Sequence, residues 1–216
     1  MQILRPVSLR EQAVRSLRGS ILGGELEAGK VYSTQSLSER LGVSATPVRE
    51  ALLDLANAGL VQPIRNRGFR IVTVDETDLD EICAVREMLE APAMRLVVEL
   101  ASDEELASVE TMLADLEAAA RERDVPRFLL IDREFHLTLL SFSRNRRLVR
   151  EVEQLRDQTR LVGISGLAAS GKLDQTAAEH RPILEALQRR DADAAEELMH
   201  SHIHHTRGIW AGREES

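Results

Sequence analysis

The 216-residue sequence predicts a mainly α protein, in which an N-terminal winged helix-turn-helix with a small β-hairpin wing precedes an all-α helical bundle. Two short helical patterns flank Gly42, and an alternating apolar pattern with an arginine-rich tip follows them. From Leu79 onward, apolar residues recur at helical spacing. These three observations divide the chain into a domain at residues 1–74, a linker at 75–78 and a second domain at 79–216.

The first helix is predicted over Leu9–Leu22. Ala13, Leu17 and Ile21 are spaced four residues apart, so they lie on one helical face. Gly23 follows the pattern and is a typical residue for the end of a helix.

Two further helices are predicted on either side of Gly42. Leu37 and Leu41 lie four apart on one face of the first, and Gly42 permits a tight reversal of the chain. Ser44 is a suitable N-cap for the second helix. Pro47 falls in the first turn of that helix, where a missing N–H costs nothing.

The second of these helices has an apolar face and a polar face. Its predicted inward stripe consists of Val48, Ala51, Leu52 and Leu55. Its opposite face carries Ala45, Thr46, Arg49 and Leu53. Hydroxyl and guanidinium groups in the exposed first half of a helix can reach base edges and phosphates in a DNA major groove. The pattern therefore predicts DNA contacts from Ser44, Thr46 and Arg49.

A β-hairpin is predicted after these helices. Residues 60–64 and 69–74 read as short strands, and Arg65-Asn66-Arg67-Gly68 reads as the turn between them. Arginines at such a tip would place positive charge on phosphates or in a minor groove. We assign Arg65, Arg67 and Gly68 to DNA contact, the alternative being a solvated surface hairpin.

Charge is divided unevenly along the chain. Residues 1–74 hold 10 Lys and Arg against 6 Asp and Glu, a net +4, whereas residues 75–216 hold 18 against 30, a net −12; the whole chain is −8. A net acidic protein can bind DNA through one local basic surface. The two parts are therefore expected to have different partners.

The second part is predicted to be a bundle of six or seven helices with no strand. The clearest helical patterns cover residues 79–100, 103–123, 125–143, 147–161, 176–189 and 192–210. Glycines punctuate residues 162–175. We predict an irregular connection there, either an ordinary loop or a mobile cover over a cavity.

The composition is typical of a cytoplasmic protein. The sequence has no run of 18 apolar residues, and its N-terminus lacks the apolar segment of a secretion signal. Cys83 is the single cysteine and falls in an apolar helical pattern, so a packed thiol is expected rather than a redox sensor. We therefore expect a reducing cytoplasm and no membrane partner.

Polar side chains fall on the inward faces of three bundle helices. Asp132 and His136 are four residues apart on a face shared with leucines. His180 lies on the apolar stripe of a later helix. On the last helix the same reasoning directs both His202 and His205 inward and does not choose between them.

A divalent cation would satisfy these inward groups. Burying a carboxylate and three imidazoles without partners is costly, and the centre of a helical bundle is a common place for metals. Three imidazoles and a carboxylate, without a thiolate, suit Zn²⁺, Ni²⁺, Mn²⁺ or Fe²⁺, of which we favour Zn²⁺. The alternative is a set of hydrogen-bonded core histidines.

Two motifs resemble a known family of regulators. Thr46-Pro47-Val48-Arg49-Glu50-Ala51-Leu52, after Leu41-Gly42-Val43-Ser44, is similar to the recognition-helix signature of GntR-type transcription regulators. Asp132-Arg133-Glu134-Phe135-His136, with His180 and His202, resembles the FCD ligand-sensing domain of the FadR-like subgroup. The resemblance spans essentially the whole chain.

The resemblance implies a dimeric, usually repressing regulator whose helical domain binds a small metabolite, often a carboxylate, beside a metal. Carried over to this chain, the implied metal ligands are Asp132, His136, His180 and His202, so the resemblance selects His202. Arg86 matches a position that the family usually keeps as arginine, and it is implied to face the effector cavity.

The chain also departs from the family pattern. Ala45 stands where arginine is common, and Tyr32-Ser33-Thr34-Gln35-Ser36 replaces the usual Leu-Pro-Ser-Glu-Arg. We therefore expect an operator that differs from the commonest one. A twofold homodimer predicts an inverted repeat, with half-sites about 34–36 Å apart or closer.

The sequence thus predicts a sequence-specific DNA-binding transcription regulator, a repressor by resemblance, whose operator binding responds to a small carboxylate. One alternative is a regulator that senses the metal itself, and another is a metal held only for structure. A third is a metal-dependent enzyme, since hydrolytic centres use the same donors. Catalysis is disfavoured because no general base accompanies the donors at motif spacing and a DNA-reading part is attached.

Overall fold

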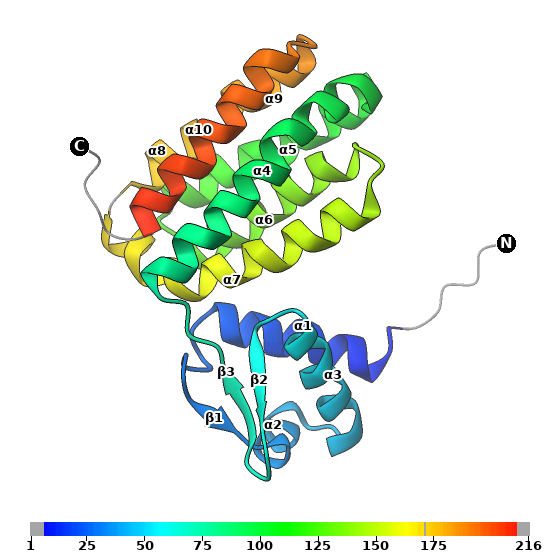
Figure 1. Cartoon of the computed structure of the whole chain (residues 1–216), viewed down its shortest axis with the longest axis vertical. Helices are drawn as coiled ribbons and strands as arrows, with labels where there is room; N and C mark the ends of the chain where they lie inside the picture. Colours follow the sequence, from blue (N-terminus) through cyan, green and yellow to red (C-terminus); the bar gives the residue numbers. More distant parts are fainter. Residues whose placement is uncertain (1–6, 171, 211–216) are drawn as a thin grey trace, which may run out of the picture. The chain divides into compact units, whose positions relative to one another are not determined.

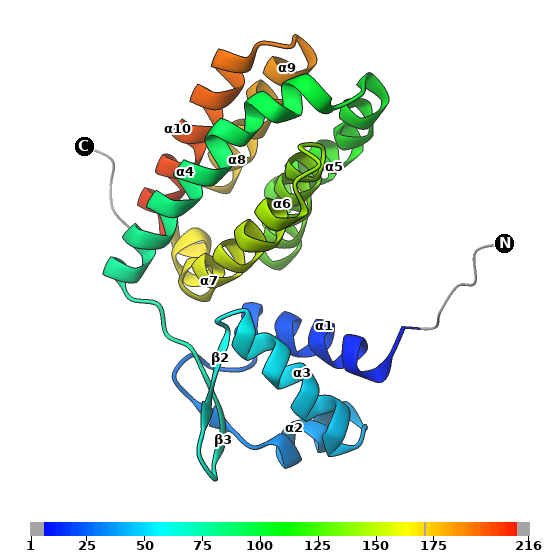
Figure 2. The ribbon, with the colours of Figure 1, turned by 45° about the vertical axis from the view of Figure 1, so that its right-hand side comes forward.

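The chain folds into two units that meet in the sequence between Thr73 and Val74. The computed structural model describes residues 7–170 and 172–210. The first unit contains three helices and a small sheet, and the second contains helices only (Figures 1 and 2). The mainly α fold with an N-terminal winged helix-turn-helix is confirmed.

The first unit packs three helices with a three-stranded antiparallel sheet. Its elements are α1 (Leu9–Leu22), β1 (Val31–Tyr32), α2 (Thr34–Leu41), α3 (Ala45–Asn57), β2 (Val61–Ile64) and β3 (Gly68–Ile71). The strand order is β1-β3-β2, so β3 is central. Val31 pairs with Arg70 on one side of β3, and Val61 pairs with Ile71 on the other.

The helices of the first unit form where the apolar pattern places them. The predicted stripes of α1 and α3 are buried, and these are Ala13, Leu17, Ile21, Val48, Ala51, Leu52 and Leu55. α2 ends at Gly42, whose φ of 67° is a left-handed conformation that glycine adopts without steric cost. Ser44 occupies the N-cap position of α3, although its hydroxyl makes no capping hydrogen bond there.

The second unit is a helical bundle. Its helices are α4 (Glu76–Leu100), α5 (Asp103–Arg121), α6 (Val125–Ser141), α7 (Arg146–Ser170), α8 (Leu173–Ala178), α9 (His180–Gln188) and α10 (Ala192–Trp210). α4 packs along α10, and α6 packs against both α5 and α7. Their buried faces form one apolar cluster that includes Met94, Leu113, Phe135 and Ile203. None of the described helices is both long and apolar enough to cross a membrane.

The structure differs from the sequence prediction in four places. Most of residues 162–175 are helical and not irregular, because α7 continues to Ser170 and α8 begins at Leu173; residue 171 lies outside the described residues. A single glycine costs a helix only about 1 kcal/mol relative to alanine, and the flanking residues of α7 are good helix formers. The predicted helix over 176–189 is divided at Glu179 between α8 and α9.

The other two differences lie at element ends. Residues 76–78, predicted as a linker, form the first turn of α4, because Asp75 and Asp78 make a reciprocal capping box. The strand β1 was not predicted, because two residues are too short to show an alternating pattern.

Candidate metal centre and nucleic-acid interface

Four predicted ligand side chains converge at the centre of the bundle. Asp132 and His136 lie one turn apart on α6, His180 begins α9, and His202 lies on α10. All four are buried, with at most 7% of any residue exposed. One ligand atom from each lies within 4.8 Å of the others. His205, the other candidate on α10, keeps 42% of its side chain exposed and is not in this cluster.

The distances within the cluster fit a shared cation. The Nε2 atom of His136 lies 3.2 Å from the Nε2 atoms of both His180 and His202. Asp132 Oδ1 lies 3.1 Å from His180 Nε2 and 3.7 Å from His136 Nε2. Two donors that each lie about 2.1 Å from one ion are separated by roughly 3.0–3.4 Å. The four donor atoms therefore surround a space that suits one ion.

Hydrogen bonds outside the cluster determine which ring nitrogen faces it. His180 Nδ1 lies 2.9 Å from the carbonyl oxygen of Thr176, and His202 Nδ1 lies 2.8 Å from Glu179 Oε2. Because both partners accept hydrogen bonds, each Nδ1 carries a proton and donates it. The Nε2 atoms of His180 and His202 both face the cluster, where each lies 3.2 Å from His136 Nε2.

With all three rings neutral, protons do not satisfy every contact in this arrangement. A neutral His180 ring has one N–H but faces two acceptors, Thr176 O and Asp132 Oδ1. A single proton on His136 Nε2 can point at only one of its two imidazole neighbours. A cation at the centre would accept all of these lone pairs at once, so the residues present fit a divalent metal.

The ionisation states match the needs of a metal site. Burial and the nearby Arg156 guanidinium hold the pKa of His136 well below its ordinary value. Burial and the neighbouring His180 lower the pKa of His202 to about 4. Burial alone would raise the pKa of Asp132, but His180, His136 and Arg156 together hold it well below its ordinary value. A neutral imidazole and an ionised carboxylate are the forms that bind metals.

A buried ion-pair network adjoins the cluster. Arg86 Nε donates to Glu90 Oε1 at 2.7 Å, and Arg156 Nε donates to Glu90 Oε2 at 3.0 Å. Arg156 Nη1 also lies 3.5 Å from Asp132 Oδ2. Although burial opposes it, the two guanidinium groups lower the pKa of Glu90. His136 Nδ1 has no hydrogen-bond partner among the described residues and lies 4.0 Å from Glu90 Oε2.

Sequence reasoning missed several members of this network. Glu90 follows Arg86 by four residues, and Glu179 directly precedes His180, so both had a local signal in the sequence. Arg156 had none, because its partners lie on other helices. Arg86, implied by the resemblance to face an effector, is 1% exposed and is paired with Glu90.

The first unit gathers most of the predicted DNA-contacting residues around one hollow. A pocket of about 500 Å³ is lined by Arg49 of α3 and by Arg65, Arg67 and Gly68 of the hairpin. Ser33 and Thr34, at the start of α2, complete one wall. The three arginines are exposed. Ser44 and Thr46 are also exposed but do not line this hollow.

Gly68 has a conformational reason to be glycine. Its φ is 121°, and a Cβ atom there would lie 2.1 Å from the carbonyl oxygen of Tyr32. No side chain fits such an approach, because the obstructing atom belongs to the backbone of β1. Gly68 therefore lets the hairpin pair closely with β1.

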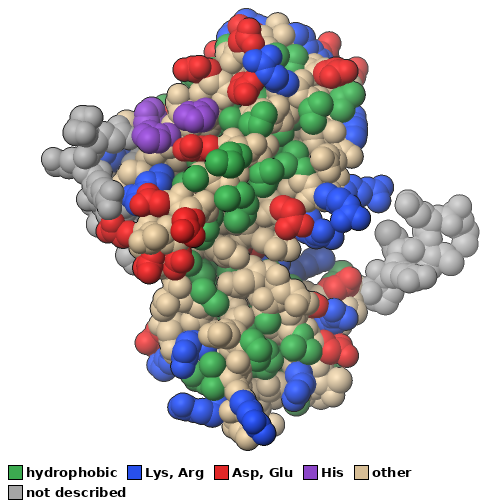
Figure 3. Space-filling view, viewed as in Figure 1, with side chains coloured by type: hydrophobic (Ala, Val, Ile, Leu, Met, Phe, Trp, Pro, Cys, Tyr) green, Lys and Arg blue, Asp and Glu red, His purple; other side chains and the backbone are tan. Residues whose placement is uncertain are grey.

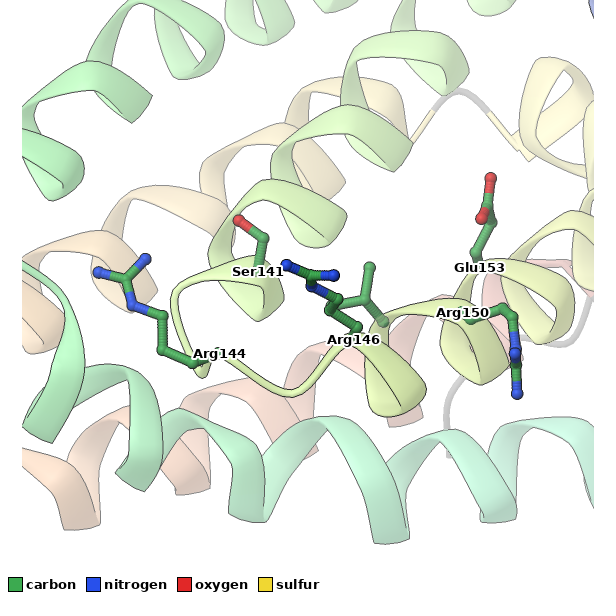
Figure 4. A pocket seen from close by; sticks show the side chains of 6 residues that line it. Ser141, Arg144, Arg146, Arg150 and Glu153 are labelled. Atoms are coloured by element: carbon green, nitrogen blue, oxygen red, sulfur yellow. The ribbon is translucent and has the colours of Figure 1, made fainter.

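A second hollow, of about 510 Å³, lies where α6 ends and α7 begins (Figure 4). It is lined by Ser141, Arg144, Arg146, Val149, Arg150 and Glu153. Arg144 pairs with Glu105, and Glu153 pairs with Arg133. Much of its charge is thus already neutralised within the protein, and none of its lining residues belongs to the buried cluster.

Comparison with known proteins identifies a family for each of the two units. The family model described as "Bacterial regulatory proteins, gntR family" matches residues 9–71, and the one described as "FCD domain" matches residues 81–205. The chain is 29% identical over 202 residues to the HTH-type transcriptional regulator YdhC of Bacillus subtilis (strain 168), covering 93% of this chain and 90% of that protein.

Two further relatives are named regulators. The chain is 33% identical over 152 residues to the HTH-type transcriptional regulator McbR of Escherichia coli (strain K12), covering 70% of this chain and 69% of McbR. The solved structure of E. coli McbR/YncC matches with a TM-score of 0.86 at 28% identity, covering 95% and 98% of the two chains. A probable D-xylose utilization operon transcriptional repressor of Paenarthrobacter nicotinovorans is 31% identical over 187 residues, covering 85% of this chain and 80% of the repressor.

Proposed function

Because the chain belongs to the gntR family of bacterial regulatory proteins, with an FCD domain as its second part, we propose that it is a homodimeric repressor controlled by a small carboxylate and a bound metal ion. The families and the named relatives are transcriptional regulators, and one of those relatives is named a repressor. A protein that binds an operator works beside the chromosome, so its proposed location is the cytoplasm.

The DNA contact proposed for the first unit combines α3 with the hairpin. Arg49, at the exposed side of α3, would reach a base edge in the major groove, as would Thr46. Arg65 and Arg67 would hold phosphates from the hairpin tip, and Ser44 offers an uncommitted hydroxyl. The shared hollow supports this proposal, since it presents Arg49 and the tip arginines side by side.

The observation that carries the metal proposal is the pair of fixed imidazole rings. Thr176 and Glu179 hold His180 and His202 so that both Nε2 atoms lie 3.2 Å from His136 Nε2. His136 and Asp132 complete the donor set. Zn²⁺ is favoured among Zn²⁺, Ni²⁺, Mn²⁺ and Fe²⁺. When bound, such a cation supplies a Lewis-acidic position at which a ligand carboxylate can coordinate.

Arg86 and Arg156 support the carboxylate part of the proposal. They share the Glu90 carboxylate, and Arg156 also reaches toward Asp132. A metabolite carboxylate has the same chemistry as Glu90, so it would compete with Glu90 for Arg86. The ion pairs of Arg86 would then differ between the free and the ligand-bound bundle. A ligand shifts a conformational equilibrium only if it binds one conformation more tightly than the other, and this change in pairing would supply that difference.

An apolar stripe on α4 supports the homodimer. Val85, Met88 and Leu96 are 42%, 72% and 41% exposed, and exposed Pro92 lies between the last two. These positions follow one another at three- or four-residue spacing, so they share one helical face. Figure 3 shows hydrophobic side chains gathered over this part of the second unit. Exposed apolar surface of this kind marks interaction sites.

The test is thermal unfolding of untagged protein, metal-loaded and chelator-stripped, against a panel of small mono- and dicarboxylates. An acid present at 100 times its Kd adds about 2.7 kcal/mol to the free energy of unfolding. We expect one acid class to raise the melting temperature only in the metal-loaded protein. His202→Gln should abolish this rise, whereas the matched change His205→Gln, on the same helix but outside the cluster, should preserve it.

Other outcomes would revise the proposal in separate parts. If stripping lowers the melting temperature and no acid has an effect, the metal is structural and the carboxylate proposal is wrong. If stripping leaves the melting temperature unchanged, the buried cluster holds no metal. Operator binding that follows the free metal concentration without any acid would identify the metal itself as the signal.

A further inference from the structure

A second group of metal-binding side chains lies at the surface of the bundle. His200 and His204 are on α10, and their side chains are 57% and 74% exposed. Glu87, on the neighbouring helix α4, lies close to both of them. Figure 3 shows surface histidines over α10 with an acidic side chain beside them. None of these three residues is part of the buried cluster.

The helix places the two imidazoles on a common face. Residues four apart in an α-helix are neighbours on its surface, so His200 and His204 project together from α10. His202 lies between them in sequence but points into the bundle, where it is 3% exposed. One helix therefore presents one imidazole to the interior and two to solvent.

The carboxylate of Glu87 lies near both exposed rings. Its Oε2 atom is 3.6 Å from His200 Nε2, and its Oε1 atom is 3.8 Å from His204 Nδ1. These separations slightly exceed the roughly 3.0–3.4 Å between donors that share one ion. The two contacts use different oxygens of Glu87, and the three side chains do not converge as closely as the four of the buried cluster. Both imidazoles are more than half exposed, so rotation of their side chains can bring the donor atoms closer together.

In the part of the chain that the structure describes, no lysine or arginine pairs with Glu87. Among the described residues, the ion pairs of Glu87 are with the two imidazoles only. Arginines on the same two helices are engaged elsewhere, since Arg95 pairs with Asp193 and Arg207 pairs with Asp80. A carboxylate between two imidazoles thus remains available to an ion from solution.

We infer that His200, His204 and Glu87 form a second, solvent-open site for a divalent transition metal that joins α4 to α10. Two imidazoles and a carboxylate suit Zn²⁺, Ni²⁺, Co²⁺ and Cu²⁺, and they disfavour Mg²⁺ and Ca²⁺, which take oxygen donors. Because its two imidazoles are exposed, this site binds more weakly than the buried one and exchanges its ion with solvent.

The position of the site gives the ion a consequence for the bundle. α10 carries His202 of the buried cluster, and α4 carries Arg86 and Glu90 of the adjoining network. An ion held by Glu87 and the two histidines would tie these helices together from outside. The outer site would therefore stabilise the packing between the helix that carries His202 and the helix that carries the adjoining ion-pair network.

The experiment counts metal ions per chain. Untagged, chelator-stripped full-length protein is titrated with Ni²⁺ by calorimetry, at low ionic strength and pH 7.5. Two equivalents are expected, one tight and one at least tenfold weaker. The double variant His200→Gln/His204→Gln should lose the weaker equivalent and keep the tight one. Glu87→Gln should weaken the outer equivalent about tenfold or more.

Matched variants separate this inference from the proposed inner site. His205→Gln removes another partly exposed histidine of α10 and should leave both equivalents in place. His202→Gln should remove the tight equivalent and keep the weaker one. Circular dichroism of each variant establishes that the helices are intact.

Two results would overturn the inference: a double variant that binds as many equivalents as the unaltered protein, or loss of the weaker equivalent in His205→Gln. Because the inner site is scored on a separate equivalent and a separate variant, its failure would not be mistaken for failure of the outer one.

Discussion

Two of the three imidazoles in the proposed metal site are oriented by residues outside the proposed donor set. The Thr176 carbonyl holds one ring, and the Glu179 carboxylate holds another. Glu179 lies at the break between α8 and α9, so its side chain reaches α10 while the next residue, His180, enters the cluster. Such outer partners fix the tautomer and raise the basicity of the ligand nitrogen.

Glu179→Gln is therefore expected to reduce metal affinity. An amide keeps a hydrogen-bond acceptor for His202 Nδ1 but removes the negative charge, and losses of about 10–100-fold are typical for such outer partners. Competition with a chromophoric chelator measures the change. Glu185→Gln on exposed α9 surface is the matched control, and equal affinities for the two variants would contradict the role assigned to Glu179.

Arg49→Ala is expected to weaken operator binding by about 1–3 kcal/mol and to relax the preference for one base pair. Arg67→Ala should instead weaken binding to all sequences alike and lower the salt slope by about one, as the loss of a phosphate contact does. Duplexes selected from a random pool, titrated at several salt concentrations, distinguish the two effects. Arg189→Ala in the second unit is the control, and unchanged affinity in Arg49→Ala would remove the central DNA contact.

At the scale of elements, helical periodicity explains both what could be predicted and what could not. It placed the stripes of α1 and α3 correctly because those helices are apolar on one side only. It failed at residues 162–175, where glycines suggested a break that α7 does not make. A glycine is a local signal, whereas the continuation of a helix depends on what the whole helix packs against.

The candidate metal centre was also predictable from the sequence only in part. Asp132, His136 and His180 were directed inward by the leucines around them, and the structure buries all three. Periodicity could not choose between His202 and His205, because residues three apart in a helix differ by only about 60° in direction. The link from Glu90 to Arg156 joins residues 66 apart in sequence, so no local pattern contains it. Metal binding itself stays a prediction.

The next prediction concerns the stability of the β2–β3 hairpin. Gly68→Ala is expected to destabilise the first unit, since the added Cβ meets the backbone of β1 at a φ of 121°; the strain is of order 1–3 kcal/mol. The free energy of unfolding measured in urea and the affinity for the operator should both fall. Gly19→Ala is the counterpart, because nothing lies within 4 Å of its Cβ inside α1, and it should stabilise the unit by up to about 1 kcal/mol. Equal effects of the two substitutions would contradict this account.

At the scale of the whole molecule, charge and apolar surface assign different partners to the two units. The first unit holds the net positive part of the sequence and the arginine-lined hollow. The second is strongly acidic yet exposes the apolar stripe of α4. An acidic surface repels DNA, while a neutral apolar stripe within it can meet a second copy of itself.

Met88→Asp is expected to shift the protein from dimer to monomer, because it places a charge in the most exposed position of the α4 stripe. Sedimentation equilibrium measures the change, and operator affinity should fall with it. Leu130→Asp on α6, at a side chain that is also 58% exposed, controls for the added charge. A dimer that survives Met88→Asp but not Leu130→Asp would place the interface on α6 instead.

The spread of the metal donors along the chain sets an order of events during synthesis. The donors run from Asp132 to His202, on helices that must all dock before four atoms can surround one ion. The first unit, in contrast, closes its core within its own residues, which leave the ribosome earlier. If the proposed metal site is correct, each new molecule would acquire the means to read DNA before it acquires a place for the ion, and metal uptake would then report that the helices through α10 have been completed.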